Sequence, residues 1–259
     1  MIFDLTGWTR VTATGADAAK FLQSFCTNDV LKSLGPDGPG GCEAFFTSEK
    51  ARVLGHGWVL RGEGGAVEFV GTPGQGPQLI AHLSKYALME DASFADRTGG
   101  PVSYTPPRPI TGDQPPLTDW LDGGSFSLGP VPPGAAPLNE ERRIAAKLPR
   151  HGVDVGPDRL AMEADRPWAI CYTKGCYLGQ EPVARVRALG RVNKLLRGFR
   201  LAFPPGPPSP TGGAAVVAGD AEVGTVTSAA GHVALGYVKR AHAEPGTAVT
   251  AGGAAAVVF

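Results

Sequence analysis

The chain has 259 residues with 24 basic and 24 acidic side chains, so its formal net charge is zero. A hydrophobic content of 42% excludes a wholly disordered or membrane-embedded chain. Four cysteines are too few for a disulfide scaffold, which favours a reducing compartment. The N-terminus has no secretory-signal pattern, and no stretch reaches the roughly 18 apolar residues of a membrane helix. We therefore expect a cytoplasmic protein without a membrane span.

Residues 1–100 predict an α+β unit in which strands and amphipathic helices alternate. One helix follows Thr14 and Asp17, which have the spacing of a capping box, and a second begins at Pro77. The expected strands, in chain order, are 8–14, 42–47, 52–60, 66–70 and 92–96. This order is typical of ferredoxin-like α+β folds.

The remaining chain divides at two proline-rich segments. Prolines punctuate residues 101–138, which predicts a linker or a subdomain reduced to loops. Asn139 should cap a helix that ends at Pro149. After a second linker at 204–210, short β-like pieces with glycine turns predict a small barrel. We expect three units, at 1–100, 101–203 and 204–259.

Positive charge is concentrated between Arg166 and Arg200. This stretch has eight basic residues and one acid, Glu181, for a net charge of +7. Such a stretch is either a seat for a polyanion or a solvated face balanced by acids elsewhere in the fold, and composition alone leaves both open.

The segment KGCYLGQEPVAR, from Lys174 to Arg185, carries the most chemical information. Gly175 and Gly179 allow sharp turns on both sides of Cys176, and Pro182 is well placed to open a helix. Cys176 should thus lie on an exposed loop, where Lys174 would favour its thiolate. The alternative is a buried, inert cysteine.

This segment resembles the signature of the YgfZ proteins, which are folate-binding relatives of the aminomethyltransferase of the glycine cleavage system (GcvT). Three further parts of the chain also resemble that family, so the similarity covers nearly the whole chain. They are the block FLQSFCTNDV at 21–30, the helix RIAAKLP at 143–149, and the barrel segments at 223–228 and 234–238.

The resemblance implies a GcvT-like ring of ferredoxin-like α+β subdomains with a C-terminal β-barrel and tetrahydrofolate in a central channel. It implies a role in assembly or repair of iron–sulfur enzymes, including ones that modify tRNA, so the expected partners are a folate and iron–sulfur client enzymes. Cys176 and Lys174 would be the reactive residues. The residues expected to contact folate are Trp8, Glu163, Tyr177, Gln180, Glu181, Arg185 and Arg187.

Departures from the family pattern leave enzymatic activity open. GcvT proteins carry an acid that orients the folate amine after the strand at 66–70, whereas residues 71–76 here contain none. Ala145 stands where the family has another acid, and Asn139 stands near a missing second tryptophan. Two alternatives are a one-carbon transferase and an RNA-binding module, although few aromatic residues accompany the basic stretch. The cysteine and histidine spacing predicts no metal site.

Overall fold

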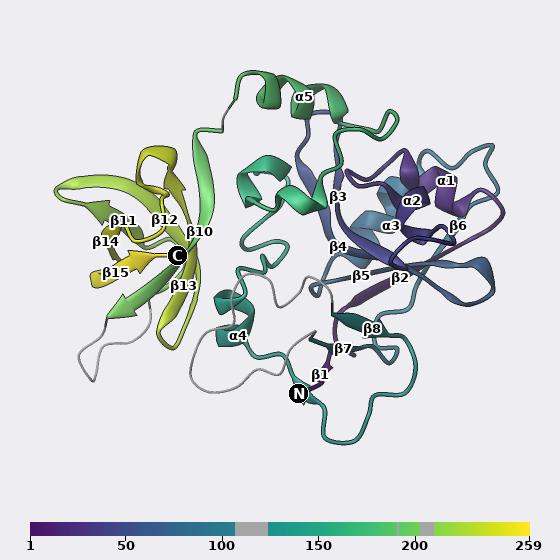
Figure 1. The fold of residues 1–259 in the computed structure, drawn as a ribbon, viewed down its shortest axis with the longest axis horizontal. Coiled ribbons are helices and arrows are strands. Elements are labelled where there is room, and N and C mark those ends of the chain that lie inside the picture. Colours follow the sequence, from purple (N-terminus) through teal and green to yellow (C-terminus); the bar gives the residue numbers. More distant parts are fainter. Residues whose placement is uncertain (107–123, 191, 203–209) are drawn as a thin grey trace.

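The structure is a computed structural model that describes residues 1–106, 124–190, 192–202 and 210–259. An α+β part lies at one end and a β-barrel at the other, with helices α4 and α5 between them (Figure 1). The expected linker at 101–138 falls partly outside the described residues, and the one at 204–210 falls almost wholly outside them. Within the described residues, no helix is long and apolar enough to cross a membrane.

The α+β part is built on a five-stranded antiparallel sheet with the order β3-β4-β5-β2-β6. All five expected strands are confirmed within one residue at each end. They are β2 (Thr9–Thr14), β3 (Gly41–Thr47), β4 (Val53–Arg61), β5 (Val67–Gly71) and β6 (Ser93–Asp96), with the short 3-10 turn η1 (Glu63–Gly65) between β4 and β5.

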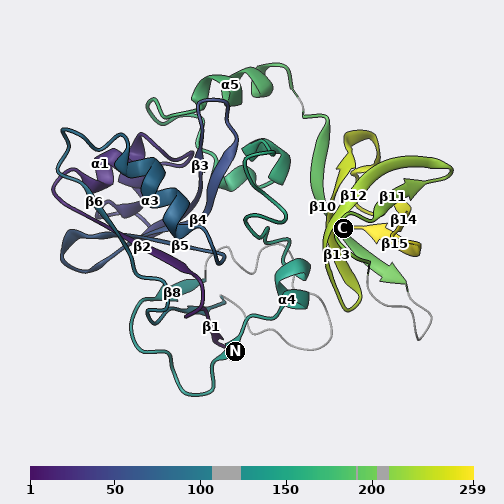
Figure 2. The ribbon, with the colours of Figure 1, turned by 180° about the vertical axis from the view of Figure 1, so that it is seen from behind.

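Three helices cover one face of this sheet, as Figures 1 and 2 show from opposite sides. They are α1 (Ala18–Gln23), α2 (Val30–Leu34) and α3 (Gly76–Ser84). Phe21 and Leu22 of α1 pack with Leu79 of α3 on the buried side chains of the sheet. The apolar spacing thus identified the core face of both longer helices.

The predicted capping box of α1 is wrong. Thr14 ends β2, and Asp17 makes no side-chain cap. Its carboxylate instead accepts a hydrogen bond from the Asp91 amide at 3.0 Å, while the Asp91 carboxylate accepts one from the Ala16 amide at 2.8 Å. Asp17 therefore ties the helix to the distant turn before β6, a contact that local spacing cannot encode.

A small sheet in the order β8-β7-β1-β9 joins the N-terminus to residues beyond 100. Its strands are β1 (Phe3–Asp4), β7 (Ser103–Thr105), β8 (Ser125–Ser127) and β9 (Ala136–Pro137). Buried residues of this sheet and of the five-stranded sheet share one apolar cluster, which contains Phe3, Trp8, Trp58 and Tyr104. The division into three units stays a proposal, because β1 pairs across the boundary drawn at 100.

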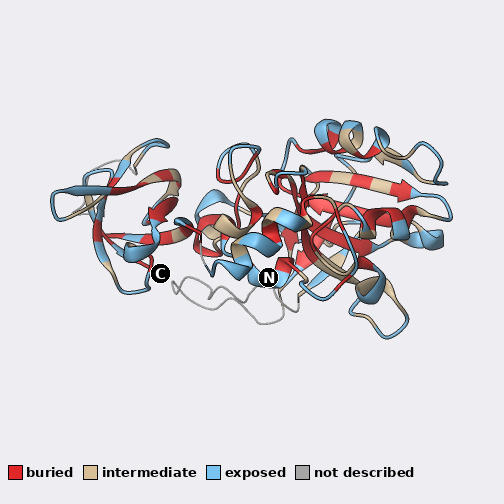
Figure 3. Ribbon diagram, turned by 90° about the horizontal axis from the view of Figure 1, so that it is seen from above, coloured by how far each residue is buried: buried red, intermediate tan, exposed pale blue. Residues whose placement is uncertain are grey.

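The C-terminal barrel closes in the order β10-β13-β12-β11-β14-β15. Its strands are β10 (Lys194–Ala202), β11 (Ala215–Ala218), β12 (Ala221–Ala230), β13 (Val233–Lys239), β14 (Ala248–Ala251) and β15 (Ala254–Val258), with the turn η4 (Arg240–His242) after β13. The barrel begins at Lys194 rather than at 204, because β10 precedes the proline run that suggested the boundary. The α+β fold with a C-terminal barrel is confirmed, and buried residues fill both ends of the molecule (Figure 3).

The middle segment contains α4 (Glu140–Ala145), the turns η2 (Ala161–Ala164) and η3 (Pro167–Ala169), and α5 (Gln180–Ala188). The side chain of Asn139 caps α4 by accepting a hydrogen bond from the Arg142 amide, as the sequence predicts. The helix ends at Ala145, four residues before Pro149, because Lys147 adopts a left-handed conformation.

Asp154 joins this middle segment to the barrel. Its side chain is buried and contacts Arg143 of α4 at 2.8 Å and the Ser228 hydroxyl of β12 at 2.7 Å. The Tyr237 hydroxyl of β13 donates to the Asp154 carbonyl at 2.9 Å. One buried carboxylate with a full set of donors thus fixes the barrel against α4.

Candidate functional site at the signature loop

The signature loop, residues 171–179, docks on the α+β part through the backbone. The Cys171 amide donates to the Thr27 carbonyl at 2.8 Å, and the Leu178 amide donates to the Ser24 carbonyl at 2.9 Å. The Thr47 hydroxyl at the end of β3 donates to the Leu178 carbonyl at 2.7 Å. These bonds hold the loop between α1 and β3 and place its C-terminal end at the start of α5.

The two glycines of the loop have different environments. Gly179 has a φ of +85°, and a Cβ there would lie 2.5 Å from the Ser48 carbonyl oxygen. Gly175 has no positive φ, and a Cβ there would meet no atom within 4 Å. Gly179 therefore needs to be glycine, whereas Gly175 does not.

We expect Gly179→Ala to lower the free energy of unfolding by about 1–3 kcal/mol, because it combines left-handed backbone strain with a clash against backbone. Gly175→Ala is the matched control, one residue before Cys176, and should change stability by less than about 0.5 kcal/mol. Urea unfolding of both variants tests this pair. Equal effects would show that Gly179 is not fixed against β3.

Lys174 lies in the interior and not beside the Cys176 thiol. Its Nζ donates to the carbonyls of Cys26 at 2.8 Å and Asn28 at 2.7 Å, and to that of Gln23, and lies 5.1 Å from the centre of the Tyr177 ring. Burial lowers the pKa of its amine, and the Asp29 carboxylate opposes this shift. The expected role of Lys174 in activating Cys176 is corrected, because its side chain is used to close the 23–28 loop.

The four cysteines of the chain are free and have different exposures. Cys176 is exposed, as the sequence predicts, whereas Cys26 is buried and Cys42 and Cys171 are half-buried. Burial raises the pKa of the Cys26 thiol and raises that of Cys42 to about 12, so neither is a thiolate at neutral pH. Cys176 is thus the thiol most open to a partner.

Two cavities open beside the loop and share one wall. The first, of about 350 Å³, lies between the loop and α5, and the second, of about 250 Å³, lies between α5, η2 and the barrel. Tyr172 and Arg187 line both, with the Arg187 guanidinium 4.1 Å from the centre of the Tyr172 ring. The other residues that line the first cavity are Cys171, Tyr177, Gln180, Val183, Ala184 and Ala188. The other residues that line the second cavity are Met162, Asp165, Arg166, Pro167, Ile170, Val186, Gly190, Val192, Leu195 and Arg240.

The structure brings three of the predicted folate contacts, Tyr177, Gln180 and Arg187, to the first cavity. Glu181 and Arg185 instead form an ion pair at 2.7 Å one turn apart on α5, with both side chains mostly exposed. Such pairs contribute little to stability and do not define a site by themselves.

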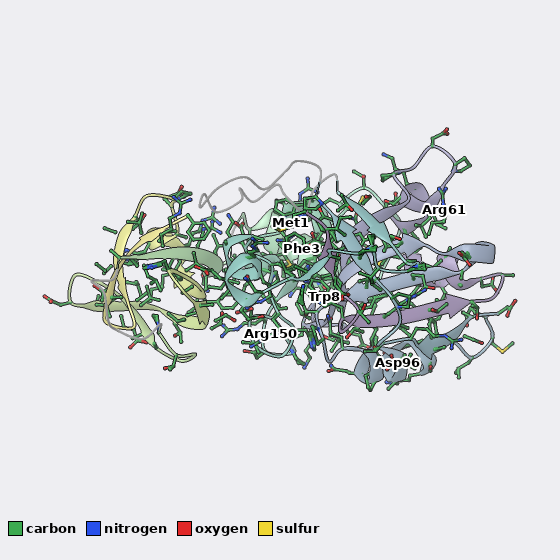
Figure 4. All side chains as sticks on the ribbon, turned by 90° about the horizontal axis from the view of Figure 1, so that it is seen from below. Met1, Phe3, Trp8, Arg61, Asp96 and Arg150 are labelled. Carbon is green, nitrogen blue, oxygen red and sulfur yellow. The ribbon has the colours of Figure 1, made fainter. Side chains whose placement is uncertain are left out.

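Trp8 and Glu163 are not among the residues that line the loop cavities, although Glu163 follows Met162, which lines the second one. Trp8 is buried beside Trp58, with ring centres 6.3 Å apart, and Figure 4 shows it near Phe3 in the middle of the molecule. The Glu163 carboxylate accepts a hydrogen bond from the Leu160 amide at 3.0 Å and so caps η2. Packing and capping thus use both side chains in the fold, and their expected contact with folate stays a prediction.

A buried group of polar side chains around Glu43 links β3 to the segment that precedes the signature loop. The sequence pattern did not predict it. Glu43 of β3 accepts hydrogen bonds from Arg166 Nη2 at 2.7 Å and from the Trp168 indole at 2.8 Å, and lies 2.6 Å from His56 Nε2. Arg166 also lies over the Trp168 ring, 4.8 Å from its centre. Glu43 is a single acid in an otherwise apolar strand, and a buried carboxylate needs cationic partners. That position could therefore have indicated a buried ion pair.

Electrostatics keep Glu43 ionised. Burial opposes its charge, but the Arg166 guanidinium and the hydrogen bonds from Arg166 and His56 outweigh burial and hold the Glu43 pKa well below its usual range. Burial lowers the pKa of His56, so its imidazole is neutral and donates from Nε2. Its Nδ1 has no hydrogen-bond partner in the described residues, as fits a bare acceptor.

A third and larger cavity, of about 590 Å³, lies on the sheet face away from α1 and α3. Its floor is the Arg10–Glu68 ion pair at 3.1 Å, and the Thr12 hydroxyl donates to Glu68 at 2.8 Å. These three groups satisfy one another's hydrogen bonds.

Comparisons with known proteins agree with this architecture. The family described as the CAF17 C-terminal beta-barrel domain matches residues 197–259. The C-terminal part of the chain is therefore similar to the CAF17 barrel. This match confirms the resemblance to the YgfZ-like proteins over the barrel.

The whole chain has the GcvT-like fold. The glycine cleavage system aminomethyltransferase T of Bartonella henselae superposes with a TM-score of 0.75 at 19% identity, over 100% of this chain and 84% of that one. The Arabidopsis thaliana protein named "Putative transferase At1g60990, chloroplastic" is 26% identical over 97% of this chain and 68% of its own length. The expected fold class is thus confirmed with its aminomethyltransferase-like arrangement.

Proposed function

We propose that this protein binds tetrahydrofolate at the signature loop and supports the assembly or repair of iron–sulfur enzymes, including ones that modify tRNA. The observation that carries the proposal is the pair of cavities that share Tyr172 and Arg187 next to the exposed Cys176, on a GcvT-like fold. We propose the cytoplasm as its location, while the plant relative carries a chloroplastic name.

The lining residues fit a reduced folate. The Tyr172 ring is 38% exposed and offers a flat surface for the pterin or aminobenzoyl ring. Asp165, held by Arg197, is an acid on the wall of the second cavity that can accept hydrogen bonds from pterin N–H groups. Arg187 supplies positive charge for the glutamate carboxylates. Volumes of 250 and 350 Å³ are near the lower end for small-molecule sites, so one ring system would occupy one cavity.

The residues that follow β5 argue against glycine cleavage. The turn there contains no acid. The Gln75 side-chain amide donates to the carbonyls of Thr72 at 2.8 Å and His56 at 3.0 Å. A carboxamide is not a base at neutral pH, so Gln75 cannot replace the missing acid in moving a proton of the folate amine. We therefore propose a binding and assembly role for the folate rather than an aminomethyl transfer.

Cys176 is the residue that would act on the iron–sulfur client enzymes. Its exposed thiol is a soft ligand that suits the iron of an iron–sulfur cluster, and the open space around Gly175 leaves room for a partner surface. The folate bound a few residues away would fix the conformation of this loop. We expect no direct nucleic-acid binding, so contact with tRNA would occur through the client enzyme.

Anaerobic calorimetry with tetrahydrofolate tests the site. We expect submillimolar binding to the native protein and affinity about three- to tenfold weaker for Tyr172→Ala, because an aromatic contact contributes about 0.5–1.5 kcal/mol. Trp8→Phe is the control and should bind as the native protein does. Weakening by Trp8→Phe alone, with Tyr172→Ala unaffected, would place the folate elsewhere.

A further inference from the structure

The five-stranded sheet has two edge strands, and one of them has no cover within the described residues. At β3, residues 26–28 run alongside the strand: Cys26 forms a β-bridge with Phe46, and the Thr27 amide donates to the Phe45 carbonyl at 2.9 Å. At the opposite edge, β6 pairs with β2 on one side and has no described strand on the other. An uncovered edge strand presents unpaired N–H and C=O groups to a chain that lies beside it.

The register of β6 shows which of its backbone groups face outward. The amide of Arg97, just after β6, donates to the Arg10 carbonyl of β2 at 2.7 Å. In an antiparallel pair, the residues that bond to the neighbouring strand alternate along the chain. Phe94 and Asp96 therefore direct their backbone N–H and C=O groups away from β2. This spacing is the one that peptide binding by strand addition requires.

The side chains at this edge carry opposite charges on opposite faces of the sheet. Arg97 lines the cavity of about 590 Å³ on the face away from the helices. Asp96 lies on the helix face, since a Cβ placed on Gly76 of α3 would be 2.9 Å from its carboxylate, and Phe94 packs on the same face. Arg97 and Asp96 are both exposed, and Arg97 forms no ion pair with a carboxylate of the described residues.

We propose that the free edge of β6 binds an extended segment of a partner protein as a sixth strand, antiparallel to β6. Cross-strand pairing defines its chemistry: an acid opposite Arg97, a base opposite Asp96 and an apolar residue opposite Phe94. The acid would lie on the cavity side, where there is room for it, and the base on the side of α3. With threonine opposite Ala95 and Ser93, the matching peptide reads Glu-Lys-Thr-Val-Thr. This edge lies outside the proposed folate site.

Titration of the isotope-labelled protein with this peptide, capped at both ends, tests the proposal by NMR. We expect the amide signals of Phe94 and Asp96 to shift most and to exchange more slowly with solvent, because these two amides gain hydrogen-bond partners. The control peptide Lys-Glu-Thr-Val-Thr has the same composition but places like charges opposite Arg97 and Asp96. It should bind about tenfold more weakly.

Charge reversal in the protein provides the second arm of the experiment. Arg97→Glu should remove the preference between the two peptides, and Asp96→Lys/Arg97→Glu should invert it. Lys50→Glu, at an exposed lysine away from β6, is the control and should keep the preference. Equal binding of both peptides to the native protein, a preference retained by Arg97→Glu, or no shift in β6 at millimolar peptide would overturn the proposal. None of these results bears on folate binding, which Arg97→Glu should leave unchanged.

Discussion

Glu43→Gln should lower the free energy of unfolding by about 3–5 kcal/mol, because it leaves the Arg166 guanidinium buried without its counter-charge. The same change weakens the hydrogen bond that holds the Trp168 indole. Urea unfolding followed by tryptophan fluorescence measures both effects. Glu49→Gln, at an exposed acid a few residues on, is the control and should change stability by less than about 0.5 kcal/mol.

A variant that removes both charges of the Glu43–Arg166 pair distinguishes two causes of instability. One is a buried cation without a counter-charge, and the other is the loss of the contact itself. Glu43→Gln/Arg166→Gln should be more stable than Glu43→Gln alone, since no uncompensated charge remains in the interior. A double variant as unstable as the sum of its two single variants would contradict a buried ion pair at this position.

The same centre predicts acid sensitivity with a defined sign. The depressed Glu43 pKa means that the stability it supplies is present above the usual value of 4.5 and is lost as pH falls below it. The lowered His56 pKa means that unfolding takes up a proton below the usual value of 6.5, which also lowers stability as pH falls. Thermal melts should thus decline below about pH 6.5 and fall further below 4.5. In Glu43→Gln the second decline should be smaller, and an unchanged decline would contradict this assignment.

Cys176→Ser should abolish support of iron–sulfur enzymes and leave the fold intact. The side chain is exposed next to open space, so serine should change the free energy of unfolding by less than about 0.5 kcal/mol. A hydroxyl is neither a nucleophile of comparable strength nor a soft iron ligand at neutral pH. The measurement is activity of iron–sulfur enzymes in a strain that lacks its own counterpart and expresses each variant.

Cys171→Ser is the matched control on the same loop. It should retain much of the activity, because its sulfur lies on the cavity wall with the Thr173 hydroxyl 3.5 Å away and is less open to a partner protein. Cys26→Ser should lose stability, since its sulfur is fully buried. Full activity of folded Cys176→Ser would show that the thiol is dispensable.

Most of the fold follows from local pattern, and most of the site does not. Alternating apolar residues identify β2 to β6, and Asn139 marks the start of α4, because those signals depend only on neighbours in sequence. The strand β10 was missed, since its arginines and lysine resembled a continuation of the basic loop region. Leu195, Phe199 and Leu201 pack in the barrel core, and Leu196 packs with Ile144 of α4. Lys194 and Arg200 are exposed.

The site residues depend on contacts between distant segments. Lys174 and Cys176 are two residues apart, yet the lysine turns inward to the carbonyls of the 23–28 loop and the cysteine faces outward. The contacts between Glu43 and Arg166 span 123 residues, and no local spacing predicts them. Exposure of Cys176 was predictable, because flanking glycines already indicate an open turn.

The most direct test of the proposed function is a crystal structure of the protein with a stable reduced folate such as 5-formyltetrahydrofolate. We expect ring density in a cavity bounded by Tyr172 and Arg187, with the glutamate moiety directed toward Arg240. Density for the folate against Trp8, or in the cavity above the Arg10–Glu68 pair, would contradict it.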